Sequence, residues 1–176
     1  MPATPAAELQ AALATARPAA ERLQDALDLI GPQLRADRCF LYVRNPDRGR
    51  GRIAFVWRLD EAVPDPRHDW QADTGDLPKE DPLFRAALAC QPSVFVADVS
   101  EAGPEVLNQE FERRTFGHRA LVHAHLTENG RLWGIVQPCL FGHPRHWTAA
   151  EREYLDAAVL QLLPVVQEYM RGLDVG

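Results

Sequence analysis

The sequence is poor in cysteine and has no long hydrophobic run. Three cysteines, Cys39, Cys90 and Cys139, are spread over 176 residues, an odd number too sparse for a disulfide framework. No run approaches the roughly 18 to 20 apolar residues that a membrane-spanning helix needs. The first residues lack a basic region followed by an apolar core, so we expect no secretory signal. These absences favour a reduced, cytoplasmic protein without membrane contact.

The chain also lacks an excess of positive charge. Its formal net charge is -6, whereas binding to nucleic acid needs a concentrated basic surface. The one local basic cluster, Arg44, Arg48, Arg50 and Arg52, surrounds a turn that contains glycine, and we expect it to be solvated. We therefore expect no nucleic-acid partner.

The composition that remains is ordinary for a globular protein. Hydrophobic residues make up 46% and charged residues 25% of the chain, which is long enough for one domain with terminal helices. Residues 1–7 are rich in Pro and Ala and are expected to form a flexible tail. Residues 8–172 are expected to form a single domain.

Apolar residues near both ends of the chain recur in alternating steps of four and three. The two sets are Leu9, Leu13, Ala16, Ala20, Leu23, Leu27 and Ile30, and then Leu155, Val159, Leu162, Val166 and Tyr169. This spacing predicts helices with one apolar stripe each, kinked or restarted at Pro18 and bent at Pro164. We expect a homodimer through these terminal helices. Packing of the stripes in the chain's own core is the alternative.

The middle of the chain predicts a sheet. Short apolar strands are expected at 39–43, 53–57 and 93–99, with a long loop over 59–80 and helices over 81–89 and 103–114. Two further strands, 119–126 and 135–139, flank Asn129-Gly130, a pair typical of two-residue hairpin turns. Thr148 and Glu151 form a capping box that starts the last helix.

Three segments in the second half of the chain resemble a known family. RALVHAHL (119–126), LWGI (132–135) and PRHWTAAE (144–151) are similar to segments of GAF domains, most closely the bilin-binding GAF domains of phytochromes and cyanobacteriochromes. The resemblance covers the chain from about Gln24 to Tyr169. It implies an α+β fold: a central antiparallel sheet of five or six strands, with the N- and C-terminal helices on one face and a ligand pocket on the other.

Alternation along the strands predicts which residues face the pocket. Ala120, Val122, Ala124 and Leu126 form an apolar face suited to the helices, which leaves the odd positions for the pocket. The resemblance agrees, because it places pocket residues at His123, His125 and Cys139. Trp57 beside the Pro-rich loop could stack on a planar ligand, and Arg119 could hold an anionic group. The candidate ligand-binding residues are Trp57, Arg119, Leu121, His123, His125, Ile135, Gln137 and Cys139.

The sequence departs from the resemblance at the residues that attach bilin. Leu107-Asn108 stands where cyanobacteriochromes carry a Cys-His pair, and no cysteine lies between Cys90 and Cys139. Attachment near the N-terminus, as in phytochromes, would need a cysteine before Cys39. A thioether link requires a thiolate, so we expect no covalent bilin, and we predict no cofactor.

His123 and His125 also suit other chemistry. Two histidines at alternate strand positions lie roughly 6 to 7 Å apart, a usable spacing for metal ligands, and Cys139 could add a third ligand or a nucleophile. The competing interpretation is that the imidazoles hydrogen-bond across a polar pocket. We expect neither a metal site nor catalytic residues. The predicted function is non-catalytic small-molecule sensing or regulation, signalling through contacts with a second copy or a separate effector protein. A small redox or metal-dependent enzyme and a dimerisation scaffold are the alternatives.

Overall fold

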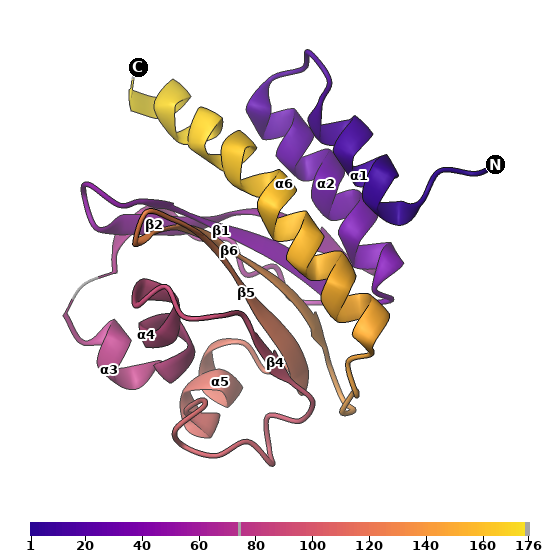
Figure 1. Ribbon diagram of the computed structural model, residues 1–176. Coiled ribbons are helices and arrows are strands. Elements are labelled where there is room, and N and C mark those ends of the chain that lie inside the picture. Colours follow the sequence, from indigo (N-terminus) through magenta and orange to yellow (C-terminus); the bar gives the residue numbers. More distant parts are fainter. Residues whose placement is uncertain (74, 175–176) are drawn as a thin grey trace.

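Figure 1 shows the computed structural model of the chain, which describes residues 1–73 and 75–174. Helices cover both faces of one sheet: α1, α2 and α6 lie on one face, and α3, α4 and α5 lie on the other. In chain order the elements are α1 (Pro5–Leu13), α2 (Ala19–Gln33), β1 (Arg38–Asn45), β2 (Arg50–Arg58), β3 (Gln71–Ala72), α3 (Leu77–Glu80), α4 (Pro82–Leu88), β4 (Val94–Val96), α5 (Gln109–Thr115), β5 (Ala120–Glu128), β6 (Arg131–Leu140) and α6 (Ala149–Asp174).

The sheet has six strands in the order β3-β2-β1-β6-β5-β4, and each neighbouring pair is antiparallel. The hairpin between β5 and β6 turns at Asn129 and Gly130, whose φ angles are 52° and 71°. Two successive positive φ angles are those of the tight turn that matches strand twist. The α+β fold predicted from the sequence, with its antiparallel sheet and its terminal helices on one face, is confirmed.

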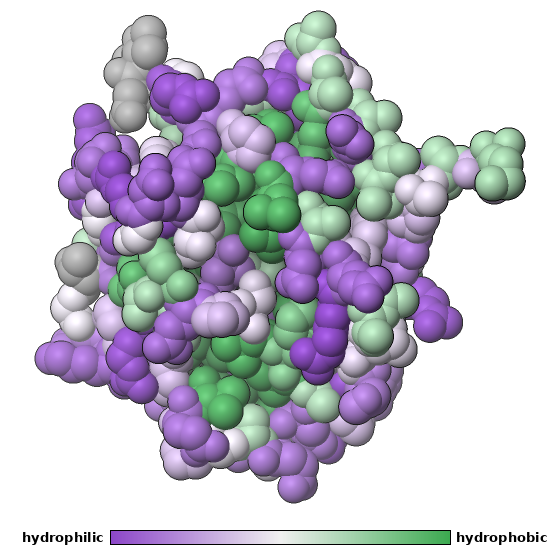
Figure 2. Space-filling model, in the orientation of Figure 1, coloured by the Kyte–Doolittle hydropathy of each residue, from purple (hydrophilic) through white to green (hydrophobic). Residues whose placement is uncertain are grey.

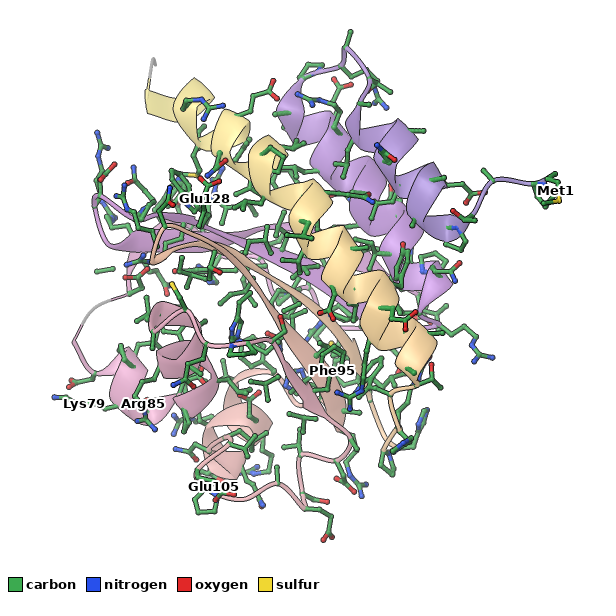
Figure 3. The ribbon with its side chains drawn as sticks, in the orientation of Figure 1. Met1, Lys79, Arg85, Phe95, Glu105 and Glu128 are labelled. Atoms are coloured by element: carbon green, nitrogen blue, oxygen red, sulfur yellow. The ribbon has the colours of Figure 1, made fainter. Side chains whose placement is uncertain are left out.

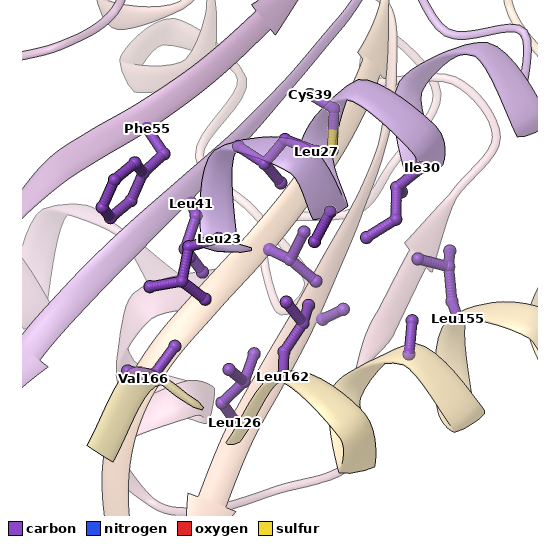
Figure 4. Close-up of a cluster of buried hydrophobic side chains, with 14 of the residues drawn as sticks. Leu23, Leu27, Ile30, Cys39, Leu41, Phe55, Leu126, Leu155, Leu162 and Val166 are labelled. Atoms are coloured by element: carbon purple, nitrogen blue, oxygen red, sulfur yellow. The ribbon is translucent and has the colours of Figure 1, made fainter. Parts of the chain in front are cut away.

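The main core lies between the sheet and the terminal helices. Figure 4 shows Leu23, Leu27 and Ile30 of α2 meeting Leu162 and Val166 of α6 above the sheet. All five side chains are completely buried within one chain. The two apolar stripes therefore pack in the chain's own core, which is the alternative to a dimer contact.

Several boundaries differ from those predicted. Thr4 caps α1, which begins at Pro5 inside the expected tail. Pro18 precedes a new helix, so the N-terminal segment is two helices and not one kinked helix. The strand expected at 93–99 extends only over Val94–Val96, and the helix expected at 103–114 begins at Gln109 after a series of turns.

The basic cluster is not simply solvated, as the sequence had suggested. The Arg44 side chain is 12% exposed and forms an ion pair with Asp73. The Asp73 carboxylate also accepts a hydrogen bond of 3.0 Å from the Tyr42 hydroxyl. Arg52 packs over the Trp70 ring. These contacts hold the segment between β2 and α3 against the sheet. Within the described part of the chain, no helix is long and apolar enough to cross a bilayer.

Candidate functional site

A cavity of about 340 Å³ lies under the face of the sheet opposite the terminal helices. Strands β1, β2, β5 and β6 form its roof, α4 and α5 form its walls, and the segment between β2 and α3 lies at its mouth. Its lining residues are Phe40, Tyr42, Ile53, Pro66, His68, Gln71, Leu77, Asp81, Phe84, Phe111, Glu112, Thr115, Phe116, His123, Ile135 and Gln137. Its volume is within the range of sites for small organic ligands.

Five of the described lining residues are phenylalanine or tyrosine. Phe40 of β1 stacks on Phe116 with ring centroids 5.7 Å apart. Tyr42 meets Phe84 edge to face at 5.8 Å, and Phe111 meets Phe116 in the same way at 6.4 Å. Rings fixed against one another in this way give a rigid apolar surface on which a flat ligand can stack.

Two carboxyl groups are buried in the same lining. Asp81 caps α4 by accepting the backbone N–H groups of Leu83 and Phe84 at 3.0 and 3.2 Å. Burial, with a smaller contribution from the charge of Glu112, raises the pKa of Asp81 to about 7. Glu112 on α5 is 1% exposed, and its Oε2 lies 2.6 Å from Nε2 of His118. Burial raises the pKa of Glu112 to about 8. Near neutral pH Glu112 is therefore largely protonated, and Asp81 is protonated in about half of the molecules.

Two hydrogen-bonded histidines, His125 and His123, lead from the backbone of Gln91 to the cavity. Nδ1 of His125 lies 2.7 Å from the carbonyl oxygen of Gln91, which can only accept, so this nitrogen carries the proton. Nε2 of His125 lies 2.8 Å from Nδ1 of His123. Burial lowers the pKa of both imidazoles, so both are neutral. Nε2 of the neutral His125 therefore accepts a hydrogen bond from the Nδ1–H group of His123. Nε2 of His123 is thereby left as an acceptor in the cavity lining.

Gln137 supplies a second polar group. It lies on β6, is 3% exposed and lines the cavity next to Ile135. Among the described residues, its side-chain amide has no hydrogen-bond partner. The amide is reached from the cavity, where a ligand can both donate to its oxygen and accept from its nitrogen.

Of the eight candidate residues, three line this cavity: His123, Ile135 and Gln137. His125 lies behind His123 and positions it without lining the cavity. The metal interpretation finds no support in the geometry, since no group of three or more His, Cys, Asp or Glu among the described residues could hold a metal ion. The two imidazoles contact each other, as the competing interpretation expected.

Leu121 and Cys139 lie on the predicted face but do not line the cavity. They pack with Leu83, Val96 and Leu107 in a separate apolar cluster. Both are completely buried, so a ligand in the cavity does not reach them.

Arg119 and Trp57 lie away from the cavity. Arg119 is at the molecular surface, where its guanidinium forms a two-pronged ion pair with Asp98 at 2.6 and 2.8 Å. The ring of Trp57 packs on the helix side of the sheet, against Gly31 of α2, and so does not line this cavity.

Sequence reasoning missed the aromatic wall and both carboxyl groups. Phe40 and Tyr42 alternate with the core residues Cys39, Leu41 and Val43, so the pattern applied to β5 could have found them on β1. In the sequence, Asp81 stood out only as the first residue of an expected helix. Nothing in the local sequence of α5 indicates that Glu112, among several charged neighbours, turns inward.

The sequence matches the GAF domain family over residues 18–163. The chain belongs to the GAF domain family. This GAF domain has its helices, sheet and cavity in the arrangement that the resemblance implied. A comparison with curated protein sequences found no match.

Solved structures share the fold of this GAF domain. A phycoerythrobilin-bound GAF domain of a cyanobacterial phytochrome superposes with a TM-score of 0.74 at 14% identity, covering 98% of this chain and 100% of that one. The GAF domain of a phosphoenolpyruvate-protein phosphotransferase from Acinetobacter gives 0.72 at 10% identity, covering 97% and 95%. The photoproduct state of a GAF domain from Synechocystis gives 0.64 at 24% identity, covering 87% and 97%. Identities this low establish the fold alone.

Leu107 and Asn108, which the sequence resemblance matches to the bilin-attaching pair, both have structural roles in this GAF domain. Leu107 is completely buried in the apolar cluster with Leu121 and Cys139. Asn108 caps α5 by accepting the backbone N–H of Phe111 at 3.1 Å. None of the described residues that line the cavity is a cysteine.

Proposed function

We propose that this GAF domain is a non-catalytic sensor or regulator that binds a small molecule, without a covalent bond, in the cavity beneath its sheet. The observation that carries the proposal is the Gln137 amide, which belongs to a nearly buried residue, lines a cavity with aromatic walls and has no partner among the described residues. With the acceptor on His123, it provides two fixed polar contacts in an apolar site, a common composition of ligand pockets.

Non-covalent binding follows from the chemistry of the lining. The bilin-attachment position holds Leu107, and the cysteines Cys39 and Cys139 are buried in apolar clusters away from the cavity. Protein co-produced with bilin should therefore give no zinc-dependent fluorescence in its band on a denaturing gel. A fluorescent band at the mass of the chain would contradict this part of the proposal.

The output of the domain is proposed to pass through protein contacts, either with a second copy or with an effector. Free thiols at Cys39, Cys90 and Cys139 suit a reducing cytoplasm. The cavity roof is the sheet on which α2 and α6 pack, so a ligand that shifts the strands acts directly on the support of the terminal helices.

A cavity-blocking variant tests the proposal. Thr115 is exposed at the end of α5 and lines the cavity, so Thr115→Trp should fill the space without disturbing the core. Arg113, on the same helix, is 72% exposed and does not line the cavity, which makes Arg113→Trp the matched control. Ligand-observed NMR with a library of small heteroaromatic compounds should give binders to the wild-type protein and to Arg113→Trp that Thr115→Trp loses. Equal binding to all three proteins, or no binder at all, would reject the cavity as a sensing site.

A further inference from the structure

The cavity is lined by acidic side chains and not by strongly basic ones, among the described residues. Its described lining includes two carboxyl groups, Asp81 and Glu112, and no arginine or lysine. The carboxyl groups come from different helices, since Asp81 begins α4 and Glu112 lies in the first turn of α5. A ligand carboxylate or phosphate would therefore be desolvated in this cavity without a cation to pair with it.

Several groups in the cavity lining can accept a hydrogen bond from a ligand. His123 presents an unprotonated nitrogen, because its other nitrogen donates to His125. The Gln137 carbonyl and the free oxygen of each carboxyl group add further acceptors. A ligand that carries several N–H groups can therefore donate to His123, to the Gln137 carbonyl and to a carboxyl group, most strongly once that carboxyl group has lost its proton.

From these observations we propose that the ligand is a planar heteroaromatic cation with N–H donors, such as a protonated aromatic amine, and that the cavity rejects carboxylates and phosphates of similar shape. The inference rests on the proposed function, since it names the ligand class of the same cavity. The rings of Phe40, Phe84 and Phe116 supply the flat apolar contact, and aromatic faces attract cations.

Other charged groups near the site lie outside it. Arg85 of α4 is exposed and points away from the sheet, as does Lys79 of α3 (Figure 3). His68 at the mouth is only half-buried. His118 lies behind Glu112 and does not line the cavity.

Two arginines lie behind lining rings and could favour the opposite charge: Arg114, whose guanidinium lies 6.0 Å over the Phe111 ring and which pairs with Glu80, and Arg38. The Arg38 guanidinium lies over the Phe40 ring at 5.5 Å and over Phe141 at 4.9 Å, and Nη1 donates to the carbonyl of Pro64. Nε and Nη2 are buried and have no partner among the described residues. Since Phe40 separates Arg38 from the cavity, an anion could reach it only if that ring moved aside.

The two carboxyl groups make binding sensitive to pH. Burial raises the pKa of Asp81 to about 7 and that of Glu112 to about 8, so a cation that binds near neutral pH must displace a proton from at least one of them. His118 contacts Glu112, and His123 lines the same cavity. The charge of the exposed Arg85 lowers the pKa of Asp81, against the larger effect of burial. The affinity for a cation that keeps its charge should rise as the pH is raised from about 6 to about 8.

Three acridines of equal shape test the charge preference: 9-aminoacridine as the cation, acridine as the neutral ring system, and acridine-9-carboxylate as the anion. Fluorescence titration should give a dissociation constant for 9-aminoacridine at least about tenfold lower than that for acridine, and weaker binding still for the carboxylate. Thr115→Trp should abolish binding of 9-aminoacridine.

Substitution of the carboxyl groups should remove this preference. Glu112→Gln keeps a hydrogen bond to His118, and Asp81→Asn keeps the helix cap, so each should bring 9-aminoacridine to within about threefold of acridine. Glu110→Gln changes a 62% exposed residue on the same helix and should leave the preference intact.

The possible outcomes separate this inference from the proposed function. Equal or tighter binding of acridine or its carboxylate, lost in Thr115→Trp, would overturn the inference while the cavity remained a ligand site. A preference for the carboxylate would mean that the Phe40 ring moves aside and that the ligand contacts Arg38. If none of the three compounds bound to the wild-type protein, both proposals would be rejected. Selective, pH-dependent binding of 9-aminoacridine that requires Glu112 or Asp81 would support both.

Discussion

At the scale of single residues, the most unusual groups are the two carboxyl groups buried beneath the sheet. Asp81 and Glu112 lie among aromatic rings, where burial disfavours a charge, and the charge of Glu112 adds to the cost of ionising Asp81. Groups held in this state reduce stability once they ionise. Ligand recognition is the role proposed above for these two carboxyl groups.

Stability should therefore fall as the pH rises through neutrality. The folded protein holds these protons up to pH about 7 and about 8, whereas the ordinary pKa values are 3.8 and 4.5. Because the folded state binds more protons than the unfolded state across this range, raising the pH favours unfolding. Between pH about 6.5 and about 8.5 the free energy of unfolding should fall by about 2 kcal/mol. Denaturant titrations at both pH values measure this change.

The double variant Asp81→Asn/Glu112→Gln should remove most of that slope, and Glu110→Gln should retain it. A wild-type free energy of unfolding that rose over the same range would mean that these carboxyl groups are ionised in the folded protein.

The residues of the site also show how far the sequence could predict it. Alternation placed His123 and Gln137 correctly because β5 and β6 run without irregularity near them. It was not applied to Trp57 on β2, where Leu41 pairs with Phe55 while Tyr42 pairs with Ile53, which leaves Ala54 without a partner. That bulge keeps Ile53 on the cavity face and turns Phe55 and Trp57 toward the helices. No sequence pattern indicates such an insertion.

At the scale of secondary-structure elements, α2 and β2 approach each other unusually closely at Gly31. A Cβ atom built on Gly31 would lie 2.1 Å from the Trp57 ring. A side chain there would force the helix away from the sheet that forms the cavity roof. The position requires glycine for this contact, although glycine within a helix costs about 1 kcal/mol relative to alanine.

We expect Gly31→Ala to destabilise the protein by about 1 to 3 kcal/mol, the usual cost of overpacking. Gly172→Ala is the control, because no atom lies within 4 Å of the added Cβ, and it should have no effect or stabilise slightly. Thermal melts of both variants measure the difference. A Gly31→Ala protein as stable as the wild type would show that α2 does not pack this tightly on β2.

The elements themselves were largely predictable, because each has a local cause. Thr148 and Glu151 cap α6, Asp81 caps α4, and Asn129-Gly130 sets the hairpin turn. The turns before α5 and the short β3 were not predictable, because they depend on contacts with distant segments.

At the scale of the whole molecule, the buried apolar stripes change where a second copy could bind. Leu9 of α1 and Leu155 of α6 are completely buried within the chain, so a dimer must use another surface. On the face shown in Figure 2, hydrophobic side chains form patches between hydrophilic ones. Leu160 of α6 is 72% exposed, and we propose that the homodimer forms through this outward face of α6.

Light scattering should therefore give a dimeric mass for the wild-type protein and a monomeric mass for Leu160→Glu, with equal thermal stability in dilute solution. The substitution places a charge at the centre of the proposed contact and leaves the core intact. A monomeric wild-type protein at tens of micromolar would reject the homodimer, and output would then require an effector.

The central claim is that the cavity beneath the sheet binds a small ligand, and the side-chain amide of Gln137 reports on it directly. In a ¹⁵N-labelled protein titrated with the tightest-binding of the three acridines, the Gln137 amide signals should shift until saturation. The amide of Gln167, which bonds to Glu128 on the opposite side of the sheet, should not shift. Both should be unchanged in Thr115→Trp. A Gln137 signal that stayed in place while the ligand saturated the protein would contradict the account.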